Sequence, residues 1–134
     1  MNRDEEQVKA AVKSYAEAWV ANDVEAVKRL WDTQSPEGMT FIIIENDTFL
    51  LGLPAVNGYF DATIKSTKVL GGVTSDPVVR ILNPDTAYAI CTFDWKFQLG
   101  GQEHNVRARA SFILRKRADQ WLFQHMHESI NMPH

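Results

Sequence analysis

The stretch "TAYAICTFDWKFQLGGQEHNVRARASFILRKRADQWLFQHMHESI", residues 86–130, decides the fold of this chain. It contains three runs rich in β-branched and aromatic residues. Two short breaks separate these runs, "GGQE" after Leu99 and a turn at Ala118 and Asp119. Breaks this short join antiparallel neighbours as hairpins, so we expect three long, sequential antiparallel strands.

Helical spacing dominates the first third of the chain. Apolar residues from Val8 to Trp19 recur at steps of three and four, with charged residues on the other side. Asn22 and Asp23 end this helix, and a second, shorter apolar stripe follows. A short hairpin is expected where "MTFIII" and "TFLLG" flank "END", and a third helix begins at Pro54. Helices followed by long strands indicate an α+β fold, with the helices against one face of a curved antiparallel sheet.

Composition limits the kinds of protein this can be. With 134 residues, of which 45% are hydrophobic, the chain fits a single domain, residues 1–134. The net charge is −3, and basic residues cluster only in "RKR" at Arg115–Arg117, which is narrow for a nucleic-acid interface. One cysteine excludes an intrachain disulfide, and no apolar run approaches membrane-spanning length. We expect a cytoplasmic protein that binds neither nucleic acid nor a membrane.

Several motifs resemble a known superfamily. "YAEAWVANDVEAVKRLWD", "LLGLPAVNGYF" and a terminal W-x-x-x-x-x-H-x-S resemble the SnoaL-like families of the nuclear transport factor 2-like superfamily over nearly the whole chain. "ILNPDTAYAICTF" and "RKRADQWLFQHMHES" are similar to the association domain of calcium/calmodulin-dependent protein kinase II. The resemblance implies a cone-shaped curved sheet wrapped round the N-terminal helices, the cystatin-like roll, with a cavity at its open end. It also implies a homodimer or larger assembly. Relatives include isomerases, cyclases, dehydratases and non-catalytic oligomerising domains, so activity must be argued from the site.

The last strand carries the first candidate site. Strict alternation places five side chains on one face: Trp121, Phe123, His125, His127 and Ser129. Aromatic side chains with a few polar groups are typical of a small-molecule pocket. His127 is a candidate general base, with Asp32 as the group that orients it, and His125 and Ser129 are candidate ligand-binding residues. The alternative is a core histidine whose nitrogens are satisfied by neighbouring groups.

Other strands and the helices add candidate ligand-binding residues. An inward Arg109 would clamp a carboxylate, whereas an outward Arg109 would be a solvated or interface charge. Alternation puts Phe93 and Trp95 on the core or cavity side of their strand. The helices that close the cone contribute three more candidates: Tyr15, Trp31 and Tyr59. Aromatic residues at helical spacing can equally be core.

No cofactor or metal is expected. The sequence has no glycine-rich phosphate loop and no G-x-S-x-G motif. His125 and His127 point the same way, but a metal site needs a third ligand. A ketosteroid-isomerase-type mechanism needs a carboxylate base in apolar surroundings, and alternation places no acid on the apolar strand face. The acids considered for that role lie near turns or helix ends: Asp32, Glu45, Asp47 and Asp61.

The sequence therefore favours a domain that binds a small, partly apolar organic molecule in its cavity and pairs with a second copy. Isomerase, cyclase or dehydratase chemistry with His127 as base is one alternative, and a non-catalytic oligomerisation domain is another. The outward strand face expected to pair across a two-fold axis carries Ile90, Thr92, Ile113 and Met126. Trp19 and Trp121 are expected in the core.

Overall fold

Three helices lie where the sequence predicts them. The computed structural model describes residues 3–131, in which the helices are α1 (Arg3–Val20), α2 (Val24–Lys28) and α3 (Leu53–Ser66). The Asp23 carboxylate accepts a hydrogen bond from the Ala26 N–H at 3.1 Å and so caps α2, as expected. Pro54 stands in the first turn of α3, where its fixed backbone angle suits a helix start. None of these helices, within residues 3–131, has the length and apolar character needed to cross a membrane.

Within residues 3–131, the strands form one seven-stranded sheet. In chain order they are β1 (Thr40–Ile42), β2 (Leu50–Leu51), β3 (Thr67–Thr74), β4 (Val78–Asn83), β5 (Thr86–Leu99), β6 (Gln102–Arg117) and β7 (Gln120–Ser129). Their spatial order is β2-β1-β7-β6-β5-β3, and β4 pairs with the first half of β5. The predicted hairpin β1–β2 and the long strands β5 to β7 are confirmed. The sequence does not predict β3, because Gly71 and Gly72 interrupt its apolar pattern, and it does not predict that β1 runs parallel to β7.

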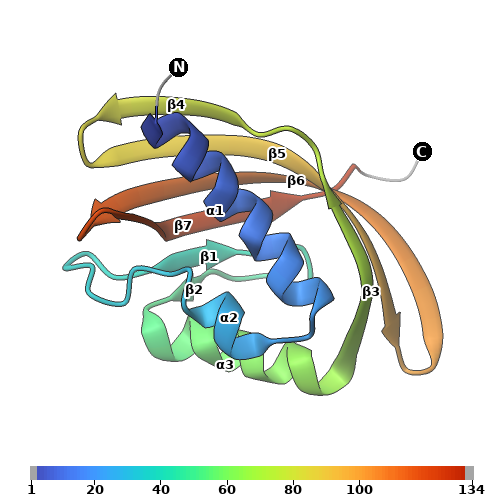
Figure 1. The fold of residues 1–134 in the computed structure, drawn as a ribbon. Coiled ribbons are helices and arrows are strands. Elements are labelled where there is room, and N and C mark those ends of the chain that lie inside the picture. The colour runs from blue at the N-terminus through green and yellow to red at the C-terminus, as the bar shows by residue number, and fades with distance from the viewer. Residues whose placement is uncertain (1–2, 132–134) are drawn as a thin grey trace.

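The core lies between α1 and the concave face of the sheet. Figure 1 shows the sheet curving round α1, with α3 beneath the lower end of the sheet. The Tyr15 ring of α1 lies 5.8, 6.0 and 5.9 Å from the ring centres of Phe93, Phe112 and Phe123 on three neighbouring strands. Trp19 and Trp121 are each 5% exposed, as the sequence predicts. Burying side chains of this size stabilises the fold by about 1.5–3 kcal/mol each.

A β-bulge in β7 changes which of its side chains face inward. Ile113 of β6 pairs with His125, whereas the next residue, Leu114, pairs with Phe123. Gln124 therefore stands between these two pairs as an extra residue without a partner on β6. Side chains alternate regularly again after Gln124. Odd-numbered residues such as Trp121 and Phe123 face inward before it, whereas even-numbered residues such as Met126 face inward after it.

The bulge overturns the predicted face of the second half of β7. Met126 is fully buried, although the sequence places it on the outer face. His127 is exposed, and the register sets it opposite Ser111 and sets Ser129 opposite Arg109 on the outer face of the sheet. The prediction that His125, His127 and Ser129 share a face with Trp121 is wrong, because strict alternation does not hold across the bulge.

Candidate functional site

A cavity of about 250 Å³ lies between α1, α3 and the inner face of the sheet. Five aromatic side chains line it: Tyr15, Trp19, Tyr59, Trp95 and Phe97. Five aliphatic side chains continue this wall: Ile44, Val69, Leu99, Val106 and Ile130. The remaining wall is polar and consists of Glu45, Thr63, Thr67 and Glu128. An apolar enclosure with a few polar groups is the usual form of a small-molecule site.

The aromatic wall surrounds the cavity from several directions. Tyr15 lies edge-on to Trp19, at 6.4 Å and 81°, and edge-on to Trp95, at 6.4 Å and 73°. Since these rings stand nearly perpendicular to one another, they do not form a flat stack. These three rings, from α1 and β5, therefore face different directions in the cavity wall.

Glu128 is the group in this cavity best placed to exchange a proton. Its side chain is partly buried, and its Oε2 accepts a hydrogen bond from the Trp95 indole N–H at 3.2 Å. Burial raises the pKa of Glu128 to about 7; the Trp95 hydrogen bond opposes this shift and the charge of Glu45 adds to it. A carboxyl group that titrates near neutral pH is suited to act as general acid or base.

Gly72 makes room for Trp95 at this position. A Cβ atom on Gly72 would lie 2.8 Å from Cζ3 of the Trp95 ring and 3.2 Å from a methyl group of Val20. The indole could not yield without moving away from its present place beside Glu128. The glycine that interrupts the apolar pattern of β3 thus sets the position of the hydrogen-bond donor to Glu128.

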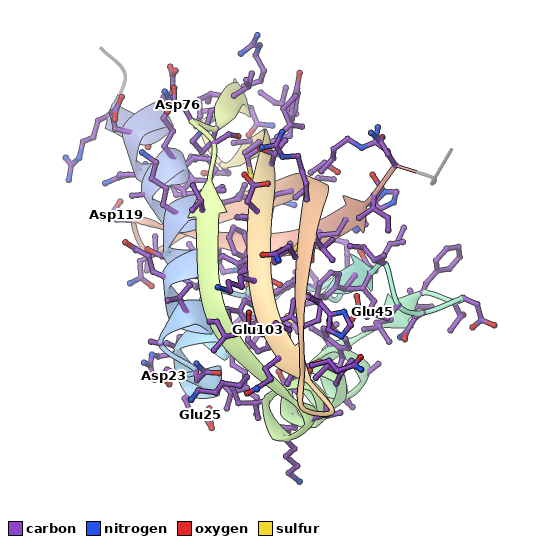
Figure 2. All side chains as sticks on the ribbon, turned by 90° about the vertical axis from the view of Figure 1, so that its right-hand side faces the viewer. Asp23, Glu25, Glu45, Asp76, Glu103 and Asp119 are labelled. Atoms are coloured by element: carbon purple, nitrogen blue, oxygen red, sulfur yellow. The ribbon has the colours of Figure 1, made fainter. Side chains whose placement is uncertain are left out.

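A second carboxylate lies at the edge of the cavity. Glu45 is exposed on the segment between β1 and β2 (Figure 2), and its Oε2 accepts a hydrogen bond from the Tyr59 hydroxyl at 2.7 Å. Burial, followed by the charge of Glu45, raises the pKa of Tyr59. Burial, followed by the charge of Glu128, raises the pKa of Tyr15. Both hydroxyl groups therefore stay neutral at physiological pH.

Several residues singled out by the sequence do come together, but outside the cavity. A shallow groove on the outer face of the sheet is lined in part by Arg109, Ser111, His127 and Ser129. Arg109 donates a hydrogen bond to the Ile130 carbonyl at 3.5 Å and has no place in the cavity wall. The interpretations of His127 as a base in the cavity and of Arg109 as an inward clamp are therefore wrong in their geometry.

His125 also lies on the outer side of β7. Its Nδ1 is 2.7 Å from the hydroxyl oxygen of Thr40 on the neighbouring strand. Burial lowers the pKa of His125, and the nearby His127 lowers it further. Within residues 3–131, no three His, Cys, Asp or Glu side chains are grouped so that they could hold a metal ion.

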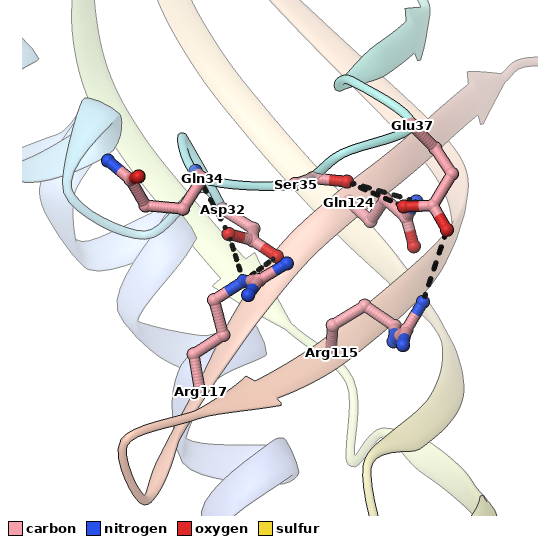
Figure 3. A network of polar contacts seen from close by, with 7 residues as sticks. All are labelled: Asp32, Gln34, Ser35, Glu37, Arg115, Arg117 and Gln124. Atoms are coloured by element: carbon pink, nitrogen blue, oxygen red, sulfur yellow. Dashed lines mark hydrogen bonds and ion pairs between the residues drawn. The ribbon is translucent and has the colours of Figure 1, made fainter.

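Asp32 belongs to an ion pair at a different place in the fold. It is fully buried, and the Arg117 Nε lies 2.6 Å from both of its carboxylate oxygens (Figure 3). The Gln34 backbone N–H donates a further hydrogen bond to it at 3.1 Å. Asp32 does not line the cavity, so the prediction that it orients His127 is wrong. Its surroundings indicate a structural role.

The structure divides the predicted aromatic residues into cavity wall and core. Tyr15, Tyr59 and Trp95 line the cavity. Phe93 is fully buried behind Trp95, with ring centres 5.0 Å apart, and Trp31 packs against Phe41, Phe60 and Phe123 outside the cavity.

The sequence motifs do not single out Glu128. Its neighbours at steps of two are Met126 and Ile130, both apolar, and this local pattern could have indicated that Glu128 faces inward.

Comparisons with known proteins agree with this fold. The family model of the SnoaL-like domain matches residues 8–133. The chain therefore belongs to the SnoaL-like domain family, within the nuclear transport factor 2-like fold that its motifs resemble. Comparison with curated proteins finds no match.

Solved structures show the same fold. A proposed dehydratase of the NTF2-like family from Streptomyces avermitilis is 21% identical, with 97% of each chain covered and a TM-score of 0.83. A ketosteroid isomerase-like protein from Erwinia carotovora atroseptica is 16% identical, with 99% of this chain and 100% of that chain covered and a TM-score of 0.79. A proposed calcium/calmodulin-dependent protein kinase II association domain from Xanthomonas campestris is 25% identical, with 94% and 86% covered and a TM-score of 0.72.

Proposed function

We propose that the protein binds a small, largely apolar organic molecule in the cavity and that Glu128 transfers a proton to or from it. The observation that carries this proposal is a carboxyl group with a pKa of about 7 in the wall of a mainly apolar cavity. Such a group is partly ionised at neutral pH, so it can take a proton from carbon or return one. Isomerases and dehydratases both need this step, and two of the solved structures above are described in those terms.

In this proposal the cavity contains the carboxylate base that a ketosteroid-isomerase-type mechanism needs, contrary to the expectation from strict strand alternation. Glu128 supplies the carboxylate, and Tyr15 and Tyr59 supply neutral hydroxyl groups in the same cavity wall. A hydroxyl that faces a carbonyl oxygen would stabilise the negative charge that develops when a neighbouring C–H proton is removed. The base in this proposal is Glu128, in place of His127.

Replacing Glu128 with glutamine should slow base catalysis in the cavity, because glutamine cannot accept the proton. A suitable probe is 5-nitrobenzisoxazole, an uncharged bicyclic molecule. A base removes its ring C–H proton while the N–O bond breaks, and the product is a coloured cyanophenolate. We expect the wild-type rate to rise with pH through about 7, as Glu128 ionises. The rate of the glutamine variant should be lower than that of the wild type by about tenfold or more, and absorbance measures both rates directly.

Glu25→Gln is the control for this measurement. Glu25 is an exposed acid on α2, so its replacement should leave the rate unchanged. An equal rate in wild type and Glu128→Gln would refute the assignment of the base.

The stability of the protein should also depend on the ionisation of Glu128. Because the pKa of Glu128 is raised in the folded state, the folded protein binds more protons than the unfolded chain between about pH 4.5 and 7, so its stability should fall as the pH rises through that window. Glu128→Gln should remove this part of the pH dependence.

We also infer that a second copy of the chain covers the outer face of the sheet. Three apolar side chains on that face remain well exposed, Tyr88 at 39%, Ile90 at 45% and Ile113 at 40%. Adjacent exposed apolar residues of this kind mark an interaction surface, and homo-oligomers most often pair through one self-complementary patch. Met126 does not contribute to this patch, because the bulge turns it inward.

The wild-type protein should therefore sediment as a dimer at micromolar concentration, and Ile113→Glu should shift it toward monomer. The added carboxylate would be buried without a partner in the interface, which is costly. Phe49→Glu is the matched control, because Phe49 is 64% exposed on the segment between β1 and β2. A wild type that sediments only as monomer would overturn the inference.

A further inference from the structure

The cavity carries acidic side chains and, among the residues that the structure describes, no basic one. Glu45 and Glu128 contribute carboxyl groups to its wall, whereas lysine, arginine and histidine are absent from that wall. The arginine expected to clamp a carboxylate, Arg109, lies on the outer face of the sheet. A ligand that carries a carboxylate would meet only like charge in the cavity, which disfavours it.

The rest of the wall attracts positive charge. Its aromatic side chains come from α1, α3 and β5, and the rings of Tyr15, Trp19 and Trp95 face different directions. The π-face of a tryptophan or tyrosine ring attracts a cation within about 6 Å, by about 0.5–1 kcal/mol at exposed sites and more where water is excluded. Aromatic rings combined with carboxylates are the chemical environment in which proteins bind organic ammonium groups.

We propose that the cavity is selective for an organic cation, namely a protonated amine on a small apolar or aromatic frame. This inference rests on the proposed function, because it takes the same cavity as the binding site and names the class of molecule that enters it. The ammonium group pairs with the carboxylate of Glu128 and lies against the aromatic wall, and Glu45 at the edge of the cavity favours entry of the cation. The apolar frame fills the part lined by Val69, Leu99 and Val106.

Binding of a cation should be linked to ionisation of Glu128. The titratable groups that face Glu128 are Tyr15 of α1, Glu45, Tyr59 of α3 and Cys91 of β5. Burial raises the pKa of both tyrosines, and it raises the pKa of Cys91 to about 12, so these three groups stay neutral near pH 7. An ammonium ion prefers the ionised form of Glu128, so binding near or below the pKa of Glu128 should release a proton.

Three probes of nearly equal size test this inference. They are 2-phenylethylammonium, 2-phenylethanol and phenylacetate, which share a benzene ring and differ in charge. Calorimetric titration about one pH unit above the pKa of Glu128 should show the cation binding about tenfold or more tighter than the alcohol, with phenylacetate weakest. About one unit below that pKa, the advantage of the cation should shrink, and titrations in buffers of different ionisation enthalpy should report proton release.

Two variants separate the contributions of the acids. Glu128→Gln keeps the size of the side chain and an acceptor for the Trp95 indole N–H, so the fold should persist while the preference for the cation over the alcohol falls about tenfold. Glu45→Gln should reduce the preference less, because Glu45 is exposed. Glu25→Gln should leave all three affinities unchanged.

The outcomes distinguish this inference from the proposed function. If 2-phenylethanol or phenylacetate binds as tightly as the cation, or if none of the three probes binds, the selectivity for cations is refuted. The proposed proton transfer stands or falls separately, on the rate of 5-nitrobenzisoxazole cleavage in wild type and Glu128→Gln. A cation preference that Glu128→Gln leaves intact would also overturn the inference, because the ion pair would then lie elsewhere.

Discussion

Replacing Arg117 with methionine should destabilise the protein by about 3 kcal/mol. This is the lower end of the range of about 3–5 kcal/mol that is typical when one partner of a buried ion pair is removed. Arg117 donates to Asp32, which is fully buried and would keep a charge with no cation beside it. We expect the lower end because the Arg117 side chain is itself 37% exposed. Denaturant unfolding followed by tryptophan fluorescence measures the loss.

A matched pair on the surface provides the control. Arg107 contacts Asp94 at 2.7 and 3.0 Å, but its side chain is 70% exposed and that of Asp94 is 46% exposed. Arg107→Met should therefore cost less than about 1 kcal/mol. Adding Asp32→Asn to Arg117→Met should recover part of the loss, because it removes the uncompensated charge. Equal losses for the two arginine variants would show that burial of Asp32 contributes little.

Replacing Trp121 with alanine should cost about 3–5 kcal/mol, the range for truncating a large aromatic residue in a core. Trp121 is 5% exposed, and its indole N–H donates a hydrogen bond to Asp4 of α1 at 3.2 Å. The ammonium group of Lys116 also lies 5.9 Å from its ring centre. The substitution removes packing and these polar contacts together. A shift of the denaturant midpoint, with unchanged slope, would report the loss.

Phe49→Ala serves as the comparison, because that aromatic ring is 64% exposed and its removal should cost less than about 1 kcal/mol. Trp121 does not line the cavity, so the folded Trp121→Ala protein should retain the activity that depends on Glu128. A loss below about 1 kcal/mol for Trp121→Ala would contradict the role of Trp121 in joining β7 to α1.

Most of the fold could be predicted from the sequence, because its signals are local. The stripe from Val8 to Trp19 and the cap at Asp23 are properties of neighbouring residues, and the structure places α1 and α2 accordingly. The parallel pairing of β1 with β7 joins segments about 85 positions apart, such as Thr40 and His125, and no local pattern specifies it. The sequence does not predict β3 for a different reason: Gly72 leaves room for the packing of Trp95 and lowers the β-propensity of its own strand.

The site was harder to predict than the fold. The motif resemblance points to Tyr15 and Tyr59, and alternation points to Trp95; all three line the cavity. Strict alternation places His127 and Glu128 on the wrong faces, because a single residue, Gln124, breaks the alternation between Trp121 and them. A bulge depends on how β7 lies against β6, so alternation counted from Trp121 does not reveal it. The apolar neighbours of Glu128 at steps of two, Met126 and Ile130, are the local signal that points to its inward face.

The bulge also affects how relatives of this protein should be aligned. Trp121 and Glu128 both face inward although an odd number of positions separates them, because Gln124 adds a residue without adding a rung to the sheet. A homologue without this residue would present the same inner wall with a shorter spacing between its tryptophan and its acid. Motif spacing is therefore a poor guide to shared chemistry along β7. Residues of β7 are better aligned by the residue of β6 with which each one pairs. Gln124 is the position at which this strand can lose a residue while each remaining side chain keeps its face.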